Sequence, residues 1–165
     1  MILADVGGVV VKRNAKLIGN LIKGFNYATR TEVVVGITEE SNAQREDGVT
    51  NSQLLYLHEN GVPSQNIPPR PVLKPAIAQE EVRDKISKMM KDALMAAFIS
   101  GNVERAEQCF ERAGMLGRDA CKDYILSGDK LAPNSEVTIQ RKGSSLPLVD
   151  TGSMLNSITY AVRKK

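Results

Sequence analysis

Apolar residues recur at intervals of three and four along much of the chain, which is the spacing of amphipathic helices. The first such stretch covers residues 14–27, and Lys16 and Lys23 lie off its apolar stripe. Its apolar positions follow the i, i+4, i+8 pattern of one helix face. The residues before it, 6–11, form a short apolar run with two glycines, which favours a strand or a buried loop. The stripe consists of Leu17, Ile18, Leu21, Ile22 and Phe25.

Two longer stretches with the same period follow each other in the second half of the chain. They cover residues 76–99 and 103–126, and Ser100-Gly101-Asn102 separates them. Long helices joined by so short a turn pack as an antiparallel hairpin. Gly114 and Gly117 weaken the second helix by about 1 kcal/mol each relative to alanine.

The remaining pattern predicts two strands, short helices and loops. Residues 31–37 are rich in β-branched side chains, and 157–163 alternate so that Ile158, Tyr160 and Val162 share a face. Short helices are expected at 52–59, capped by Asn51, at 134–141, and in a turn after a cap at Asp150 or Thr151. The acidic stretch 38–50 is typical of a loop. We expect one α+β domain over residues 1–165, in which helices pack a small antiparallel sheet and a long helical hairpin spans 76–126.

The amino-acid composition excludes several kinds of metal site but says less about the fold. The chain has one histidine, two cysteines, and only three phenylalanines and four tyrosines. This excludes multi-histidine metal sites and cysteine-rich zinc modules, and we expect no cofactor. The core must be filled by Leu, Ile, Val, Ala and Met. Cys109 and Cys121 fall in one predicted helix, about 18 Å apart, too far for a disulfide.

The net charge of +3 is unevenly distributed along the chain. Residues 1–31 and 130–165 are basic, residues 32–59 carry six acids against one arginine, and residues 60–129 are balanced. Alternating blocks suit a subunit whose surface meets the opposite charge of a neighbour, but charge alone favours solvated faces without a partner. No apolar run approaches the ~20 residues that span a membrane, and the start lacks a basic leader.

Two residue groups match catalytic chemistry without the context that it needs. Asp150-Thr151-Gly152 is the triplet of aspartic proteases, which require a second such triplet. The cap-and-turn interpretation is favoured for it. His58 beside Glu59 has no nucleophile in a motif context, so a surface or interface histidine is favoured over a general base.

Two segments, taken together, resemble tailed-bacteriophage neck and tail-completion proteins, including the minor tail protein Z-like and virion-morphogenesis groups. The first is Tyr56-Leu-His-Glu-Asn-Gly61 followed by Ile67-Pro-Pro-Arg-Pro-Val-Leu-Lys-Pro75. The second is Lys142-Gly-Ser-Ser-Leu-Pro-Leu-Val-Asp-Thr-Gly152 with Leu155-Asn-Ser-Ile158. The resemblance extends from about residue 31 to 162. The chain departs from the usual pattern at Asn60, Val72 and Met154-Leu155.

The resemblance implies a non-catalytic virion protein that forms a ring at the head–tail junction after assembly in the host cytoplasm. Its partners would be copies of itself, the portal-side connector and the tail-terminator or tail-tube proteins. It would meet no membrane, and DNA would only pass through the ring. The alternative is a DNA-contacting or regulatory protein that uses its basic termini.

The resemblance also implies where contacts would form. Residues 62–75 hold five of the seven prolines, so this segment is expected to run extended and to dock on a neighbour at little entropic cost. Arg70 would contact an acidic neighbour, and the last strand would be positioned by a tight turn. The expected interface residues are Ile67, Pro68, Pro69, Arg70, Pro71, Val72, Leu73, Glu39 and Glu40, and the turn residues are Pro147, Leu148, Asp150, Thr151 and Gly152.

Overall fold

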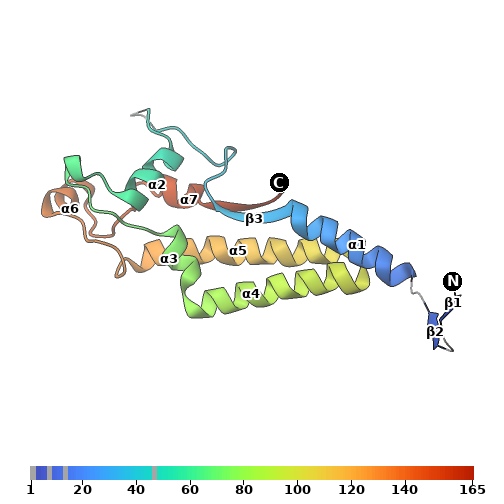
Figure 1. Cartoon of the computed structure of the whole chain (residues 1–165). Helices are drawn as coiled ribbons and strands as arrows, with labels where there is room; N and C mark the ends of the chain where they lie inside the picture. The colour runs from blue at the N-terminus through green and yellow to red at the C-terminus, as the bar shows by residue number, and fades with distance from the viewer. Residues whose placement is uncertain (1–2, 7–8, 13–14, 46–47) are drawn as a thin grey trace.

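A pair of long antiparallel helices carries a two-stranded ribbon along one side (Figure 1). The computed structural model describes residues 3–6, 9–12, 15–45 and 48–165, and the side chains of 15–45 and 48–165. The arrangement is α+β, as predicted. In chain order the elements are β1 (Leu3–Val6), β2 (Val9–Lys12), α1 (Ala15–Arg30), β3 (Thr31–Gly36), α2 (Asn51–Asn60), η1 (Pro63–Gln65), α3 (Leu73–Ala78), α4 (Glu80–Met95), η2 (Ala96–Ser100), α5 (Val103–Ser127), α6 (Glu136–Lys142), α7 (Ser153–Ser157) and β4 (Thr159–Lys164).

The predicted helical hairpin is confirmed, but its first arm is not one continuous helix. The arm begins at Leu73 rather than at Ala76, and Gln79 interrupts it with an extended ψ of 132°. Its last turn, η2, is π-helical. The predicted break is present, because Gly101 is left-handed and the Asn102 side chain accepts a hydrogen bond from the Arg105 amide at 2.9 Å.

Strands β3 and β4 pair antiparallel, as the sequence pattern predicted. The helix that they lie against is α5. Val35 pairs with Tyr160 in this ribbon. A Cβ atom added to Gly117 would lie 2.9 Å from Cγ2 of Val35, and one added to Gly114 would overlap the Tyr160 ring. The two glycines therefore form the surface of α5 on which the ribbon packs. Their cost in helix propensity is offset by this close approach.

Most of the interior is formed by two small clusters, one at each end of the hairpin. The first joins α3, α5, the loop after α5 and the start of β4, and the second joins α4, η2 and α5. Alanine is the most frequent buried side chain, which allows the helices to approach closely. The first cluster consists of Val72, Ala76, Cys121, Ile125, Leu131 and Ile158, and the second of Ala93, Ala96, Ala97, Ala106 and Phe110.

Helix α1 leads directly into β3 and crosses η2 at close range. A Cβ atom on Gly24 would lie 2.8 Å from backbone atoms of Ala97 and Phe98. The Asn20 side-chain amide donates to the carbonyl of Ile99 at 3.2 Å, and the Tyr27 ring stacks on Phe110.

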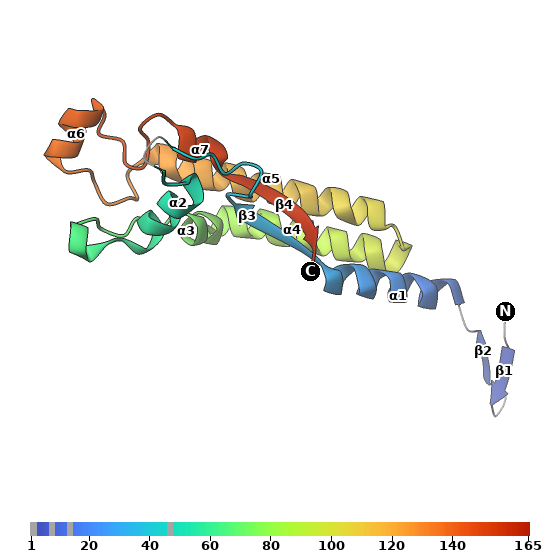
Figure 2. The ribbon, with the colours of Figure 1, turned by 90° about the horizontal axis from the view of Figure 1, so that it is seen from above.

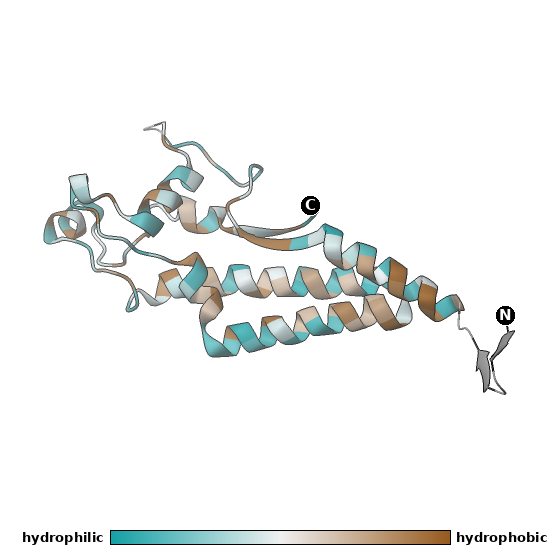
Figure 3. Ribbon diagram, in the orientation of Figure 1, coloured by the Kyte–Doolittle hydropathy of each residue, from teal (hydrophilic) through white to brown (hydrophobic). Residues whose placement is uncertain are grey.

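The apolar stripe of α1 does not face the interior. All five of its side chains are 40–60% exposed, so the periodicity predicted the helix correctly but not its orientation. In Figure 3 the stripe is visible as brown segments along α1. The face that packs on η2 is instead made of small and polar residues around Gly24.

The chain begins with a hairpin of β1 and β2, which lies beyond α1 at one end of the molecule (Figure 2). Residues 6–11, expected to form one strand or a buried loop, are divided between two strands, because Val6 ends β1 and Val9 begins β2. Gly7 and Gly8 lie outside the described residues, as does Asn14. Both cysteines are free and lie in α5, as expected.

Glycines 24 and 19 make a matched pair for testing the α1 contact. Gly24→Ala is expected to lower the free energy of unfolding by about 1–3 kcal/mol, because the backbone beneath it cannot move aside. Gly19→Ala meets open space and is expected to raise it by up to about 1 kcal/mol. Urea unfolding followed by circular dichroism measures both. A Gly24→Ala protein as stable as Gly19→Ala would contradict this packing.

Candidate partner-docking site

The two segments that carry the resemblance meet around one cavity of about 760 Å³. Helix α2 and the loop before it form one side, and α6 forms another. The cavity therefore gathers residues that are some 80 positions apart in the sequence. Its lining includes Ile67, Pro68 and Arg70 from the proline segment, Leu148, Asp150, Thr151 and Gly152 from the turn, and Arg45, His58, Ser135, Thr138, Arg141 and Lys142.

The proline segment is not extended over its whole length, contrary to the sequence-based expectation. Val62 and Ile67 form an antiparallel bridge with hydrogen bonds of 2.8 and 3.1 Å, and η1 lies between them. Asn66 closes this tight turn in the left-handed conformation. Proline fixes φ near −65°, a value equally compatible with a 3₁₀ turn, so proline content alone did not require an extended chain.

Arg70 is 7% exposed, and its partners lie within its own chain. Its Nε and Nη2 donate to the carbonyls of Ala132 and Pro133 at 2.7 and 2.8 Å. Burial lowers the pKa of the guanidinium. The expected contact of Arg70 with an acidic neighbour is thus replaced by an internal clamp that holds the loop after α5 against the proline segment.

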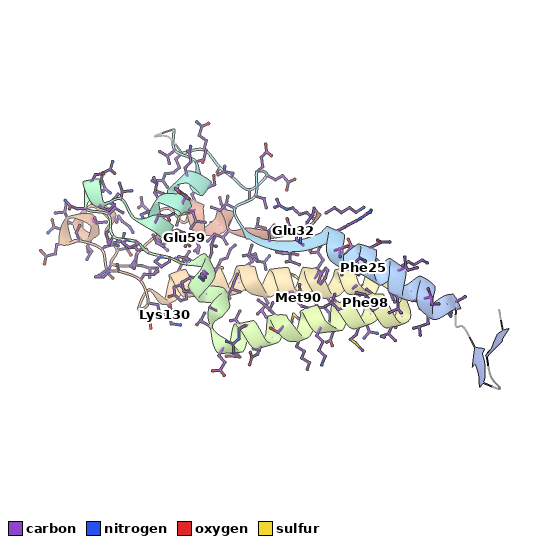
Figure 4. All side chains as sticks on the ribbon, viewed as in Figure 1. Phe25, Glu32, Glu59, Met90, Phe98 and Lys130 are labelled. Atoms are coloured by element: carbon purple, nitrogen blue, oxygen red, sulfur yellow. The ribbon has the colours of Figure 1, made fainter. Side chains whose placement is uncertain are left out.

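Glu59 holds the other end of this segment, a role that the sequence did not reveal. Its side chain lies near the start of α3 (Figure 4). Its Oε1 accepts hydrogen bonds from the amides of Val72 and Leu73, at 2.7 and 2.8 Å. These amides belong to the first turn of α3 and have no partner within the helix. A carboxylate at this position also interacts favourably with the helix dipole. Glu59 thereby fixes Val72, which is fully buried, in the core.

The turn before α7 is held by backbone conformation and by α2. Leu148 adopts a left-handed φ of 61°, which is uncommon for a branched residue. Thr151 Oγ1 accepts from the Ser153 amide at 3.3 Å, whereas Asp150 is exposed and does not cap α7. Gly152 is the N-cap residue, with a φ of 79°.

Asn51 connects α2 to this turn instead of capping α2. Its side-chain amide donates to the hydroxyls of Ser153 and Ser157 at 3.0 and 2.7 Å. Thr50 is the actual cap and forms a capping box with Gln53. The prediction for Asn51 was wrong by one residue because Thr50 has the same capping chemistry.

The cavity wall carries an excess of positive charge. Arg45, Arg70, Arg141 and Lys142 line it together with a single carboxylate among the described residues, that of Asp150. Desolvation lowers the pKa of Lys142, Asp150 opposes this shift, and Arg70 and Arg141 add to it. The arrangement favours binding of an anionic group, which would relieve the repulsion among the cations.

His58 lies at the same wall, where its surroundings disfavour the charged form of its ring. Desolvation lowers its pKa, and the charges of Arg70 and Lys142 lower it further. Its Nδ1 atom is buried without a hydrogen-bond partner in the described part of the chain. The sequence favoured a surface or interface histidine, and the structure places it half-buried in the cavity wall.

The other expected contact residues are dispersed. Pro69 and Pro71 are exposed, Leu73 is half-buried in α3, and Pro147 is buried. Glu39 and Glu40 lie exposed in a turn closed by the Ser41 amide on the Thr38 carbonyl, outside the cavity wall.

Comparison with protein-family models, curated proteins and solved structures gives no match. Within the described ranges, no group of three or more His, Cys, Asp or Glu side chains could hold a metal ion. Nor is any helix in those ranges both long and apolar enough to cross a membrane. The site is thus defined by its shape and its cationic wall.

Glu59→Ala is expected to lower the free energy of unfolding by about 1–3 kcal/mol, because two amides near the core lose their acceptor. Glu59→Gln retains a carbonyl oxygen that can accept from these amides, so its free energy of unfolding should fall by less. Glu81→Ala, which removes only an exposed pair with Lys85, serves as the control and should leave the stability almost unchanged. Denaturant unfolding compares the three. Equal losses for Glu59→Ala and Glu81→Ala would argue against the capping role.

The lowered pKa of His58 predicts a pH dependence of stability. Below pH 6.5, its ordinary pKa, the unfolded chain takes up a proton that the folded chain resists, so stability falls as the pH drops. His58 is the only histidine, so His58→Gln should flatten this part of the profile. Unfolding free energies measured between about pH 7.5 and 5.5 test this. An unchanged slope in His58→Gln would contradict the assignment.

Proposed function

We propose that this protein is a structural component of a tailed-phage virion and assembles as a ring at the head–tail junction. The observation that carries the proposal is the convergence of two motifs around one cavity. Each motif alone is short, but both contribute to the same wall, with Arg70 and Asp150 among the lining residues. Such convergence is expected where the two segments serve one binding site.

The chemistry of the cavity supports docking of an acidic partner segment. Arg141 and Lys142 supply charge at the wall, and the hydroxyls of Ser135, Thr138 and Thr151 supply hydrogen-bonding groups. In the proposed role this cavity receives a portal-side or tail-side protein of the neck. Glu39 and Glu40 are exposed outside the cavity wall, and in the proposed ring they lie at the boundary between subunits.

The role is proposed to be non-catalytic. Burial raises the pKa of Cys121 to about 12, so its thiol stays protonated at neutral pH and is a poor nucleophile. The pKa of His58 is lowered by burial and by the nearby charges of Arg70 and Lys142. In this proposal the protein acts by binding, and its partners in the virion are copies of the same chain and neck proteins.

The mass of the purified protein, alone and mixed with portal-side and tail-side neck proteins, tests the proposal. We expect a ring by light scattering and negative-stain imaging, and binding to at least one neck protein. Arg141→Glu with Lys142→Glu should abolish partner binding and leave the ring intact. Glu39→Lys with Glu40→Lys should disturb the ring.

A strict monomer that binds neither neck protein would refute the proposal. DNA binding separates it from the alternative function. A DNA-contacting protein would show affinity that falls steeply with salt, from a monomer or dimer. The proposed ring component should show only weak salt dependence of any DNA binding.

A further inference from the structure

The apolar stripe of α1 is the largest group of exposed apolar side chains on one described element. Ile22 and Phe25 are 57% and 60% exposed. At about 200 Å² for one large side chain, the five residues leave on the order of 500 Å² of apolar surface open to solvent. Met95 and Ile99, where α1 crosses η2, are also half exposed. Stable interfaces bury about 800 Å² on each partner, so this surface supplies most of one.

A complementary surface lies on α2. Val49, Ser52, Gln53, Tyr56 and Leu57 line a shallow hollow of about 460 Å³. Tyr56 is 69% exposed, and Leu57 39%. The hollow is large enough to receive side chains of the size of Phe25 and Ile22. Its described wall includes no charged side chain, which matches the uncharged stripe.

The two surfaces lie at opposite ends of the elongated molecule and cannot meet within one chain (Figures 1 and 2). A contact between two different patches is heterologous, and heterologous contacts build rings when the rotation between copies closes. A self-complementary contact between two α1 helices would give a dimer instead. The pair of patches therefore suits the proposed ring better than either patch alone.

Charge favours the same pairing. Helix α1 carries Lys16, Lys23 and Arg30 and no acidic residue, whereas residues 38–50 carry four acids against Arg45. This acidic loop leads into α2, and the Asn42 side chain accepts a hydrogen bond from the Ser52 amide. On a helical wheel the lysines lie on the flank opposite the stripe. Their charges therefore attract the acidic loop of an approaching copy at long range, and they do not form ion pairs at the centre of the contact.

We propose that the apolar stripe of α1 in one copy docks into the α2 hollow of the next copy and so forms the subunit contact of the ring. This inference rests on the proposed function for its biological role. The contact itself depends only on the two surfaces. It would bury Phe25 and Tyr56 at the same time.

Two variants, each lacking one surface, test the contact. The stripe variant carries Ile22→Asp and Phe25→Asp, and the hollow variant carries Tyr56→Asp and Leu57→Asp. Each is expected to be monomeric at 18.0 kDa, and an equal mixture should form a dimer of twice that mass, because one intact stripe meets one intact hollow. Val137→Asp, at a side chain 75% exposed on α6, is the matched control and should assemble like the wild type. Circular dichroism verifies folding.

Each other outcome has a definite meaning. If the hollow variant alone assembles, the stripe pairs with itself or with another surface, and the proposal is overturned. If the wild type stays monomeric while its stripe binds lipid vesicles, the proposal is overturned as well. If each variant alone forms rings, the proposed contact is wrong, and the proposed neck function is unaffected. A mixed dimer from a protein that binds no neck protein supports the contact and refutes the function.

Discussion

The packing of the β3–β4 ribbon on the glycine surface of α5 determines where the rest of the molecule lies. Gly114 and Gly117 admit the Tyr160 ring and the Val35 side chain at distances that alanine would not allow. Because α1 runs directly into β3 without a connecting loop, this packing fixes α1 at one end of the molecule. Because α7 and its turn run into β4, the same packing fixes the cavity wall at the other end.

The molecule that results is long and has a thin interior. Its core is built mainly from alanine and a few branched residues, and it buries few large side chains. Polar clamps therefore complete the end that holds the cavity: Glu59 caps α3, Arg70 holds two carbonyls, and Asn51 joins α2 to α7. Much of the apolar content lies on the surface instead, above all on α1. In the proposed assembly, burial of this surface against a neighbouring copy would add apolar contacts that the interior does not supply.

The sequence predicted those features that depend on neighbouring residues. The hairpin, the break at Gly101, both strands of the ribbon and their antiparallel pairing follow from periodicity, β-branching and turn chemistry. Features that depend on distant residues were missed. The contact of Glu59 with the α3 amides spans 13 positions, and that of Arg70 with Ala132 spans 62. The orientation of α1 was also missed, because Gly24 gives no local sign of the helix that it meets.

The proposed subunit contact requires that the α1 stripe and the α2 hollow become buried together when copies meet. Hydroxyl-radical footprinting of the wild type, from dilute to assembling concentrations, measures this at Phe25 and Tyr56. The aromatic side chains of Phe25 and Tyr56 are expected to lose reactivity in parallel as the mass of the assembly rises. Tyr124, which belongs to neither surface, should keep its reactivity. Assembly that leaves either Phe25 or Tyr56 as reactive as in the dilute protein would contradict the contact.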